Sequence, residues 1–282
     1  MASARQQRIA QIVKEHGYVR GRSLADLFGV TDETIRRDLT QLADAGVVRR
    51  SHGGAVALAR TETPFNRRLH QNELAKAAIG AAAAELVQEG STIIIDSGST
   101  TVHLARALRA RRDLAVVTNA VTHAAELMDN NDITVVLTGG VVRRPTYGAS
   151  GELAVATLTK LSVDQTFLAI NSVSLEHGLM YPHFEEIAVK QAMIAAASEV
   201  ILLADHTKFN QRSLVRVAPL SALSTIVSDA ELDLETQTAI RDQGIDLIIA
   251  KPEEFGYSDG DDNLSIVSPD RFGIEELVSD GL

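Results

Sequence analysis

Seven short apolar runs alternate with helical segments between residues 92 and 250, and this alternation restricts the fold more than any other feature. The helical segments are predicted at about Thr101–Ala110, Val121–Asn130, Glu152–Leu161, Glu185–Ser198 and Leu234–Gln243. The apolar runs are Thr92–Asp96, Leu114–Thr118, Ile133–Thr138, Gln165–Ile170, Val200–Ala204, Thr225–Ser228 and Asp246–Ala250. Continuous apolar strands separated by helices are typical of a parallel sheet covered on both faces. The sequence therefore predicts an α/β domain with a doubly wound parallel sheet.

The N-terminal part of the chain shows a different pattern, that of three short helices. Apolar spacing predicts the first helix over Ala4–His16 and a short second one over Leu24–Phe28, which Ser23 would cap. Thr31 is the expected N-cap of the third helix, and Gly46 is expected to end it. Two helices joined by a tight glycine-containing turn are typical of a helix-turn-helix.

The third predicted helix has one packing face and one open face. Ile35, Leu39 and Leu42 are spaced by four and three residues, so they share one side. Beyond this helix, Val47–Val56 forms two β-prone pieces around a Gly53–Gly54 turn. This predicts a winged helix-turn-helix whose third helix reads DNA, and Thr34, Arg36, Arg37 and Gln41 lie off its packing face.

The charge of the chain is segregated. Residues 1–70 carry twelve Lys and Arg against seven Asp and Glu, a net charge of +5. The remaining residues carry fifteen basic and thirty acidic side chains, a net charge of −15, which leaves −10 for the whole chain. A basic segment joined to an acidic body suits a protein that contacts phosphates with one end only. Winged helices also serve as protein–protein modules, but the basic balance favours DNA binding.

Breaks in the periodicity predict the domain boundaries. We expect a winged helix-turn-helix at residues 1–57, a linker and the start of a connecting helix at 58–75, a sensing and oligomerisation domain at 76–250, and an acidic tail at 251–282. A long helix is predicted over Phe65–Glu89. The tail holds nine acidic residues against two basic ones, so we expect it to be extended or loosely packed.

Polar loops follow the predicted strands, at the edge of a parallel sheet where ligands bind. The first loop, Asp96–Thr101, has the sequence Asp-Ser-Gly-Ser-Thr-Thr and opens a helix, so its hydroxyl and N–H groups suit an anion. Lys190 or Lys208 would neutralise the anion, and Asn and Asp side chains would bind hydroxyl groups. These features predict a sugar-phosphate site that includes Asp96, Ser97, Gly98, Ser99, Thr100, Thr101, Asn119, Gly139, Gly140, Asn171, Lys190, Asp205 and Lys208.

Three motifs follow one another in the N-terminal segment: Ser23–Thr31 (SLADLFGVT), Thr34–Leu39 (TIRRDL) and Arg50–Ala55 (RSHGGA). Together they closely resemble the N-terminal domain of DeoR-type bacterial transcription regulators. The resemblance implies a repressor, or less often an activator, of sugar-catabolic genes. It implies that the third helix enters the major groove and that the wing approaches the backbone or minor groove of an operator. The expected DNA-binding residues are Arg22, Ser23, Thr31, Thr34, Arg36, Arg37, Arg49, Arg50 and His52.

The body carries the same resemblance. Its motifs are Asp96–Thr101, Val117–Asn119, Leu137–Gly140, Asp164 with Phe167, His177–Gly178, Lys190 and Leu203–Phe209 (LADHTKF), so the resemblance covers about residues 4–250. It implies a domain similar to ribose-phosphate isomerases that binds a phosphorylated sugar. A glycine is common in the family where Asn171 and Ser172 stand, so the pocket beside Asn171 departs from the family pattern.

Two functions remain to be compared. The first is a DNA-binding regulator of a sugar or sugar-alcohol catabolic operon, acting as a homo-oligomer, a dimer or a tetramer, under the control of a phosphorylated sugar. The second is a sugar-phosphate isomerase-like enzyme with an accessory DNA-binding module. The sequence shows no spacing typical of a nucleophile, a metal site or dinucleotide binding. We therefore expect no catalytic residues, metal or cofactor, and the regulator is the preferred interpretation.

The sequence also bears on the compartment. No stretch approaches the roughly 18 uninterrupted apolar residues that a membrane span requires. The first 25 residues contain Arg5, Arg8, Lys14 and Glu15 where a signal peptide would need an apolar core. The chain contains no cysteine, which excludes disulfides and thiolate sites. We expect a cytoplasmic protein without a membrane partner.

Overall fold

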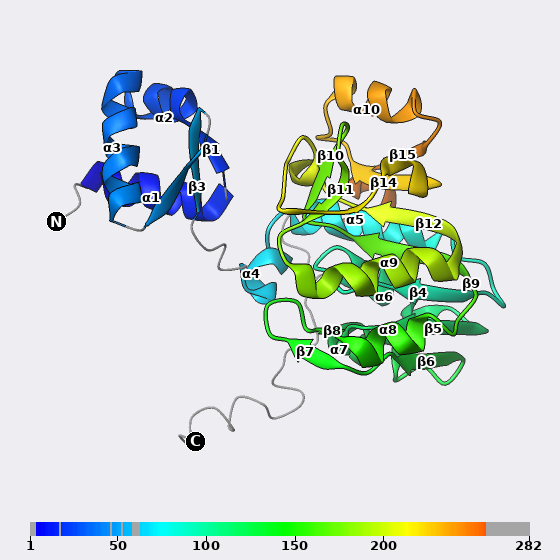
Figure 1. The fold of residues 1–282 in the computed structure, drawn as a ribbon. Helices are drawn as coiled ribbons and strands as arrows, with labels where there is room; N and C mark the ends of the chain where they lie inside the picture. Colours follow the sequence, from blue (N-terminus) through cyan, green and yellow to red (C-terminus); the bar gives the residue numbers. More distant parts are fainter. Residues whose placement is uncertain (1–3, 17, 46, 52, 58–62, 258–282) are drawn as a thin grey trace. The chain divides into compact units, whose positions relative to one another are not determined.

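The structure is a computed structural model that describes residues 4–16, 18–45, 47–51, 53–57 and 63–257. The chain divides into two compact units, Met1–Thr63 and Pro64–Leu282, and each is described by itself. Figure 1 shows the elements of both units in the colours of the sequence. The finer boundaries at residues 57, 75 and 250 stay predictions.

The N-terminal unit is a winged helix-turn-helix, as predicted. Its helices are α1 (Ala4–His16), α2 (Gly21–Phe28) and α3 (Asp32–Asp44), and its strands are β1 (Tyr18–Arg20), β2 (Val48–Ser51) and β3 (Gly54–Ala57). The strands form an antiparallel sheet in the order β1-β3-β2. Strand β1 was not predicted, because three residues are too few to show an alternation. The core of the unit consists mainly of Ile9, Val13, Leu24, Ile35, Leu39, Leu42, Val48 and Ala55.

The helix ends agree only partly with the sequence-based predictions. Thr31 caps α3 as predicted, because its side chain accepts a hydrogen bond from the Thr34 amide. Ser23 does not cap α2: the helix begins at Gly21 with Arg20 as its N-cap, so Ser23 lies inside the first turn. The predicted stop of α3 at Gly46 lies outside the described residues.

The second unit is built on a seven-stranded parallel sheet in the order β15-β14-β12-β9-β4-β5-β6. All seven predicted strands are present: β4 (Thr92–Ile95), β5 (Leu114–Thr118), β6 (Ile133–Leu137), β9 (Val163–Ala169), β12 (Ala197–Leu203), β14 (Thr225–Asp229) and β15 (Asp246–Ala250). The chain builds outward from β4 to β6, then returns to place β9 on the other side of β4. The order therefore reverses between β4 and β9, and this is the point where such sheets bind ligands.

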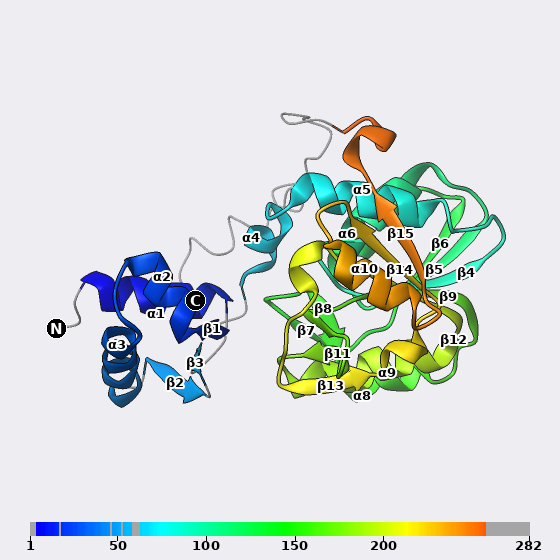
Figure 2. The ribbon, with the colours of Figure 1, turned by 90° about the horizontal axis from the view of Figure 1, so that it is seen from above.

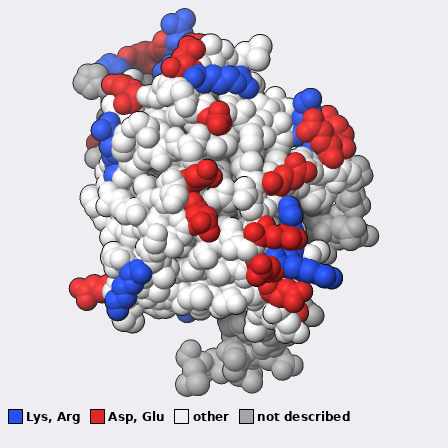
Figure 3. Space-filling view, turned by 90° about the vertical axis from the view of Figure 1, so that its right-hand side faces the viewer, with Lys and Arg blue, Asp and Glu red and all other residues white. Residues whose placement is uncertain are grey.

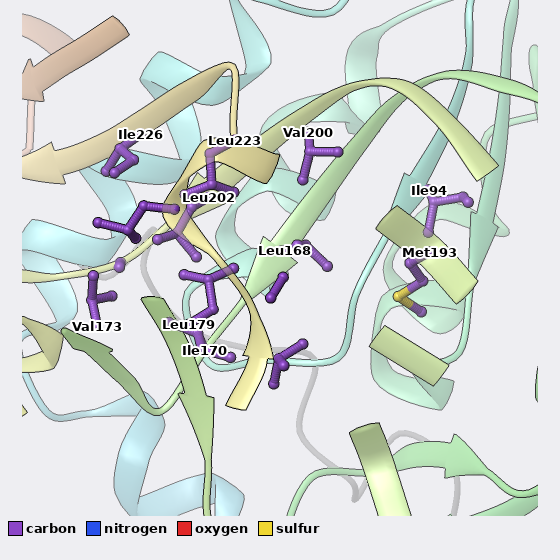
Figure 4. Close-up of a cluster of buried hydrophobic side chains, with 14 of the residues drawn as sticks. Ile94, Leu168, Ile170, Val173, Leu179, Met193, Val200, Leu202, Leu223 and Ile226 are labelled. Carbon is purple, nitrogen blue, oxygen red and sulfur yellow. The ribbon is translucent and has the colours of Figure 1, made fainter. Parts of the chain in front are cut away.

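Helices cover both faces of this sheet, which confirms the doubly wound arrangement. Helices α5 (Glu73–Ala84), α6 (Thr101–Ala107) and α7 (Val121–Leu127) pack on the face that carries Ile93 and Ile95. Helices α8 (Glu152–Leu158), α9 (Ile187–Ala196) and α10 (Leu234–Arg241) pack on the face of Ile94. Figures 1 and 2 show α5 and α9 on opposite sides of the strands, and Figure 4 shows the second cluster around Leu168 and Leu202. Successive strand residues thus enter separate cores.

The predicted long helix Phe65–Glu89 is wrong. The segment forms a short α4 (Phe65–Leu69) and a separate α5, with Asn72 between them in a left-handed conformation at φ 53°. Helix α5 ends at Ala84, before the predicted end. The alanine-rich composition favoured a single helix. In the structure, the Asn72 side chain donates a hydrogen bond to Asp205, which is distant in the sequence.

Short elements complete the second unit. The sequence did not predict the hairpin of β7 (Val141–Arg143) and β8 (Gly148–Ser150), nor the small sheet of β10 (Ser172–Ser174), β11 (Gly178–Tyr181) and β13 (Val215–Ala218). The first residues of the predicted loose tail are ordered, because Pro252–Phe255 forms a 3-10 helix and Phe255 packs on the α5 side of the core. The four further short 3-10 segments in the described part of the chain are Leu108–Ala110, Phe184–Glu186, His206–Lys208 and Leu220–Ala222.

The surface of the second unit shows no broad patch of one charge on the face seen in Figure 3, where acidic and basic side chains are intermingled with uncharged surface. Among the described residues, no helix has both the length and the apolar character that crossing a membrane requires.

Candidate functional site

The exposed side of α3 carries arginines held by a neighbouring carboxylate. Arg36 donates from Nε to Glu33 Oε2 at 2.7 Å and from Nη2 to Glu33 Oε1 at 2.9 Å. Arg37 Nε lies 3.9 Å from the same carboxylate, and the Arg36 and Arg37 side chains are 67% and 80% exposed. The hydrogen bond from Arg36 lowers the pKa of Glu33. Water screens exposed ion pairs of this kind, so an incoming phosphate can replace Glu33.

The wing is tied to the same helix. Arg50 of β2 donates from Nη1 to the Arg36 carbonyl oxygen at 2.9 Å and to Thr40 Oγ1 at 3.1 Å. At the start of α3, the hydroxyls of Thr31 and Thr34 lie 2.9 Å apart. The fold therefore gathers four predicted DNA-binding residues, Thr31, Thr34, Arg36 and Arg50, along one helix.

The remaining predicted DNA-binding residues are less constrained. Arg22 and Ser23 are exposed on α2. The side chain of Arg49 and the whole of His52 lie outside the described residues.

A buried carboxylate fixes α3 against α1. Asp38 is 5% exposed, and it accepts hydrogen bonds from Arg5 Nε at 2.7 Å and from Gln6 Nε2 at 2.9 Å. Its charge is therefore turned inward, away from the surface that Arg36 and Arg37 occupy.

In the second unit, a buried ion pair lies where the strand order reverses. Lys190 Nζ of α9 contacts Asp96 Oδ2, just after β4, at 2.5 Å and donates to the Ala169 carbonyl oxygen at 2.9 Å. The Ala169 amide donates to Asp96 Oδ2 at 3.1 Å, and Lys190 Nζ lies 4.7 Å from the centre of the Tyr181 ring. Burial raises the pKa of Asp96, against the opposing effect of Lys190. Asp96 Oδ1 has no partner among the described residues.

The loop after Asp96 approaches its neighbours closely. The Ser97 amide donates to Asn119 Oδ1 at 2.9 Å, and Asn119 Nδ2 donates to the Ala149 carbonyl oxygen at 3.2 Å. A Cβ at Gly98 would lie 2.4 Å from Ala169 Cβ, so only glycine fits there. Among the described residues, no hydrogen bond uses the amide N–H groups of this loop from residue 98 to residue 100, and these groups can bind an anion.

A second carboxylate stands beside the ion pair. Glu186 is 3% exposed and accepts from Arg143 Nη1 and, at 3.2 Å, from Thr146 Oγ1. Burial alone would raise the pKa of Glu186, but Lys190, the Tyr181 hydroxyl and Arg143 together hold it below its usual value. The turn between β7 and β8 is thereby attached to the start of α9.

Asp205 forms a third group after β12. It is fully buried, it accepts from the Thr207 amide at 3.1 Å and from Asn72 Nδ2 at 3.2 Å, and Lys208 Nζ lies 3.6 Å away. Burial would raise the pKa of Asp205, but Lys208, Thr207, Lys76 and Asn72 hold it below its usual value. The contact with Asn72 explains why the helix breaks there.

Lys76 was missed by the sequence analysis. It is 1% exposed on α5, and Nζ donates to the Arg68 carbonyl oxygen at the end of α4. No carboxylate of the described residues lies within 4.0 Å of Lys76 Nζ, unlike Lys190 and Lys208. Burial lowers the pKa of Lys76 to about 8, although Asp205 acts in the other direction. An alanine-rich helix gave no signal that this lysine points inward.

The other predicted ligand-binding residues differ in how close they lie to the end of β4. Ser99, Thr100 and Thr101 are buried at the start of α6, and Asn171 is half-buried directly after β9. Gly139 and Gly140 follow β6, two strands away from β4, and Gly140 packs against the Ser150 backbone. The structure thus brings together the loops after β4, β5, β9 and β12. Arg143 and Glu186, which the sequence analysis did not select, join them; their spacing of 43 residues left no local motif.

Two buried histidines support the loop after β4. His123 Nε2 lies 3.0 Å from Thr101 Oγ1, and its Nδ1 lies 3.1 Å from Thr122 Oγ1. Burial, with a smaller effect of Arg106, lowers the pKa of both His103 and His123 to about 3. Both are therefore neutral near pH 7. In the described part of the chain, no three His, Cys, Asp or Glu residues come close enough to hold a metal ion.

Comparison with known proteins matches both units to domains of DeoR-type proteins. Residues 5–61 match the DeoR-like helix-turn-helix domain, and residues 71–230 match the DeoR C terminal sensor domain. The HTH-type transcriptional regulator GlpR of Haloferax volcanii is 34% identical over 88% of this chain and 98% of its own length. The glycerol-3-phosphate regulon repressor of Escherichia coli K12 is 31% identical over 85% of this chain and 95% of its own length.

Solved structures give a partial likeness. Ribose 5 phosphate isomerase A from Neisseria gonorrhoeae is 20% identical, with a TM-score of 0.37 over 51% of this chain and 56% of that protein.

The buried histidines predict how stability depends on pH. Below about pH 6.5 the unfolded chain takes up protons at His103 and His123, whereas the folded protein does so only near pH 3. Stability should therefore fall with decreasing pH, by about 1.4 kcal/mol per pH unit for each histidine. His123→Gln should remove one of these contributions, measured by urea unfolding at pH 7.5 and 5.5. His70→Gln, on an exposed histidine, is the control, and equal pH dependence of the two variants would contradict the assignment.

Proposed function

Because the chain belongs to the DeoR family of transcriptional regulators, we propose that it represses a sugar or sugar-alcohol catabolic operon and that a phosphorylated sugar releases it from the operator. The N-terminal unit would place α3 in the major groove of double-stranded DNA. The ligand would bind where the strand order of the second unit reverses. The glycerol-3-phosphate regulon repressor supports a phosphorylated ligand of this kind.

The DNA-binding proposal rests on the exposed arginines of α3 and on the segregated charge. Arg36 and Arg37 are the exposed cations of this helix, and Thr34 lies near its start. Arginine forms bidentate hydrogen bonds with guanine in the major groove. One winged helix makes few phosphate contacts, so a homo-oligomer that binds two half-sites would raise the effective affinity.

Buried Lys76 is the observation that carries the ligand proposal. Each of Lys190, Lys208 and Arg143 contacts a carboxylate, whereas the hydrogen-bond partner of Lys76 among the described residues is a carbonyl oxygen. A phosphate dianion would provide the negatively charged partner that Lys76 lacks. The N–H groups of residues 98–100 would bind further phosphate oxygens. Asp96 Oδ1, which has no partner among the described residues, would accept from a sugar hydroxyl.

The same lysine provides a route from the ligand to the linker. Lys76 donates to the carbonyl of Arg68, and Arg68 Nη2 donates to the Pro145 carbonyl oxygen at 2.7 Å. Phe65 of α4 packs edge-on against Tyr147 with ring centres 5.5 Å apart. A phosphate that draws Lys76 away from Arg68 would loosen α4, the first element after the linker. About 1.4 kcal/mol of such coupling changes operator occupancy tenfold.

The enzyme alternative gains no support from the relatives, which are named as transcriptional regulators. The candidate site contains carboxylates and lysines, which are residue types that acid–base catalysis uses. Turnover of a sugar phosphate by the purified protein would decide for that alternative.

The first prediction concerns α3. Arg36→Ala and Arg37→Ala should each lower affinity at least tenfold for duplexes selected from a random pool by the wild-type protein, because each removes a base or phosphate contact. The measurement is a gel shift at one fixed salt concentration. Arg112→Ala, which removes an 80% exposed arginine of the second unit, serves as the control. Unaltered binding by both α3 variants would show that another surface contacts DNA.

The second prediction concerns Lys76. In a thermal-shift screen of fructose, glucose, glycerol and ribitol phosphates, at least one compound should raise the melting temperature of the wild-type chain. Lys76→Met should weaken that compound's binding at least tenfold while retaining the fold, because methionine fills a similar volume without a buried charge. Lys160→Met, on an exposed lysine, is the control.

The pH dependence of binding provides a second readout. Because the pKa of Lys76 is about 8, wild-type affinity should fall by up to tenfold per unit above pH 8, as the free protein loses the proton that the phosphate needs. The nearby charges are Asp205, Lys208, Arg68 and Glu73. Lys76→Met should lack this dependence, and a flat wild-type profile would remove Lys76 from the site.

The third prediction concerns coupling. Arg68→Met deletes the bond to Pro145 but keeps the backbone carbonyl that Lys76 contacts. Ligand affinity should stay within twofold, while the ligand's effect on operator affinity should fall at least threefold. Arg67→Met, at the exposed neighbouring position, should leave both unchanged. If Arg68→Met retains full release by ligand, α4 does not transmit the signal through this contact.

A further inference from the structure

Strand β6 is an edge strand of the parallel sheet. It is the last strand in the order, and β5 is its only strand partner in the described part of the chain. Figure 1 shows it as the outermost strand on its side. A free edge presents backbone N–H and C=O groups to any strand that approaches it, and natural proteins commonly protect such edges with charged residues, proline or a covering element.

The side chains around this edge are apolar and exposed. The exposed fractions are 39% for Val136, 45% for Leu137, 73% for Val141, 46% for Val142 and 70% for Leu153. We call these five residues the β6 surface. Val136 and Leu137 follow each other in β6, so their side chains flank the edge from opposite faces of the sheet. Scattered apolar residues are ordinary on a protein surface, whereas a group of them around an unpaired strand edge indicates a binding surface.

A hydrogen bond and a strand pairing show that the elements carrying the β6 surface lie close together. Thr157 Oγ1 of α8 donates to the Thr138 carbonyl oxygen at 2.9 Å, which places the last turn of α8 beside the residue that follows β6. Leu153 lies one turn earlier on the same side of this helix. Val141 pairs with Ser150 in the β7–β8 hairpin, two residues before α8. Three elements therefore meet at this edge.

The charge of the β6 surface differs from that of the rest of the unit. The stretch from residue 133 to residue 142 has no charged side chain, whereas residues 71–282 carry a net charge of −15. Two copies of so acidic a body repel each other least when they meet through an uncharged face, because no like charges are then brought into contact. A heterologous partner of opposite charge would find no acidic side chain on this strand to bind.

We propose that the β6 surface binds the same surface of a second copy of this chain, with the two β6 strands antiparallel across a two-fold axis. An isologous interface requires a self-complementary patch, and an uncharged apolar edge is self-complementary. The two edges would satisfy each other's backbone groups, and the valines and leucines would be buried together. This inference specifies the surface behind the homo-oligomer of the proposed function, but it does not depend on DNA or ligand binding.

The absence of cysteine from the chain makes a direct test possible. A single introduced cysteine can crosslink only to the same residue of another copy. Val136→Cys and Val141→Cys should each give at least fivefold more crosslinked dimer with a short bismaleimide than Leu234→Cys at equal concentration. Leu234 is 78% exposed on α10 and serves as the matched control.

A charge placed on the edge provides the second measurement. Val136→Lys should halve the mass of the full-length chain in sedimentation or light scattering, with circular dichroism and ligand-induced thermal shift retained, and Leu234→Lys should not. A wild-type chain that is monomeric at all concentrations would overturn the proposal, because another segment or partner would then cover the edge. Unchanged mass of Val136→Lys, or equal crosslinking of all three cysteine variants, would also overturn it. Loss of ligand response alone would concern the proposed function instead.

Discussion

The ion pair between Lys190 and Asp96 is the constraint on which the second unit depends. It joins α9 to the end of β4 across the point where the strand order reverses, and the Ala169 backbone completes it. Both groups lie out of water, where removal of one partner leaves a charge that the interior does not solvate. The pair therefore gives the loops after β4 and β9 one arrangement, and the geometry of the site follows from it.

Lys76 is the contrasting case. Its charge is as deeply buried as that of Lys190, but its hydrogen-bond partner is a backbone carbonyl, so its pKa is depressed by burial. A site that holds one incompletely compensated cation is poised for an anion. Because the carbonyl belongs to Arg68, at the end of α4, the proposed ligand binding and the position of that helix would share one hydrogen bond.

The N-terminal unit separates anchoring from recognition on a single helix. Asp38 holds α3 against α1 from the inside, whereas Glu33 binds Arg36 on the outside. The outer pair is screened by water and can be exchanged, while the inner group is enclosed. Because Asp38 fixes the inner side of α3, the helix can keep its position when Arg36 exchanges Glu33 for another anion.

The sequence alone determined the seven parallel strands, the helix-turn-helix and the polar loops that follow the strands, because apolar periodicity and polar residues at strand ends are local signals. It missed the break at Asn72, the buried Lys76 and the pairing of Arg143 with Glu186. Each depends on a partner distant in the chain: Asp205 binds Asn72, and Glu186 stands 43 residues from Arg143. Composition assigned the alanine-rich segment to one helix, and only tertiary contacts decided where it bends and which charges it buries.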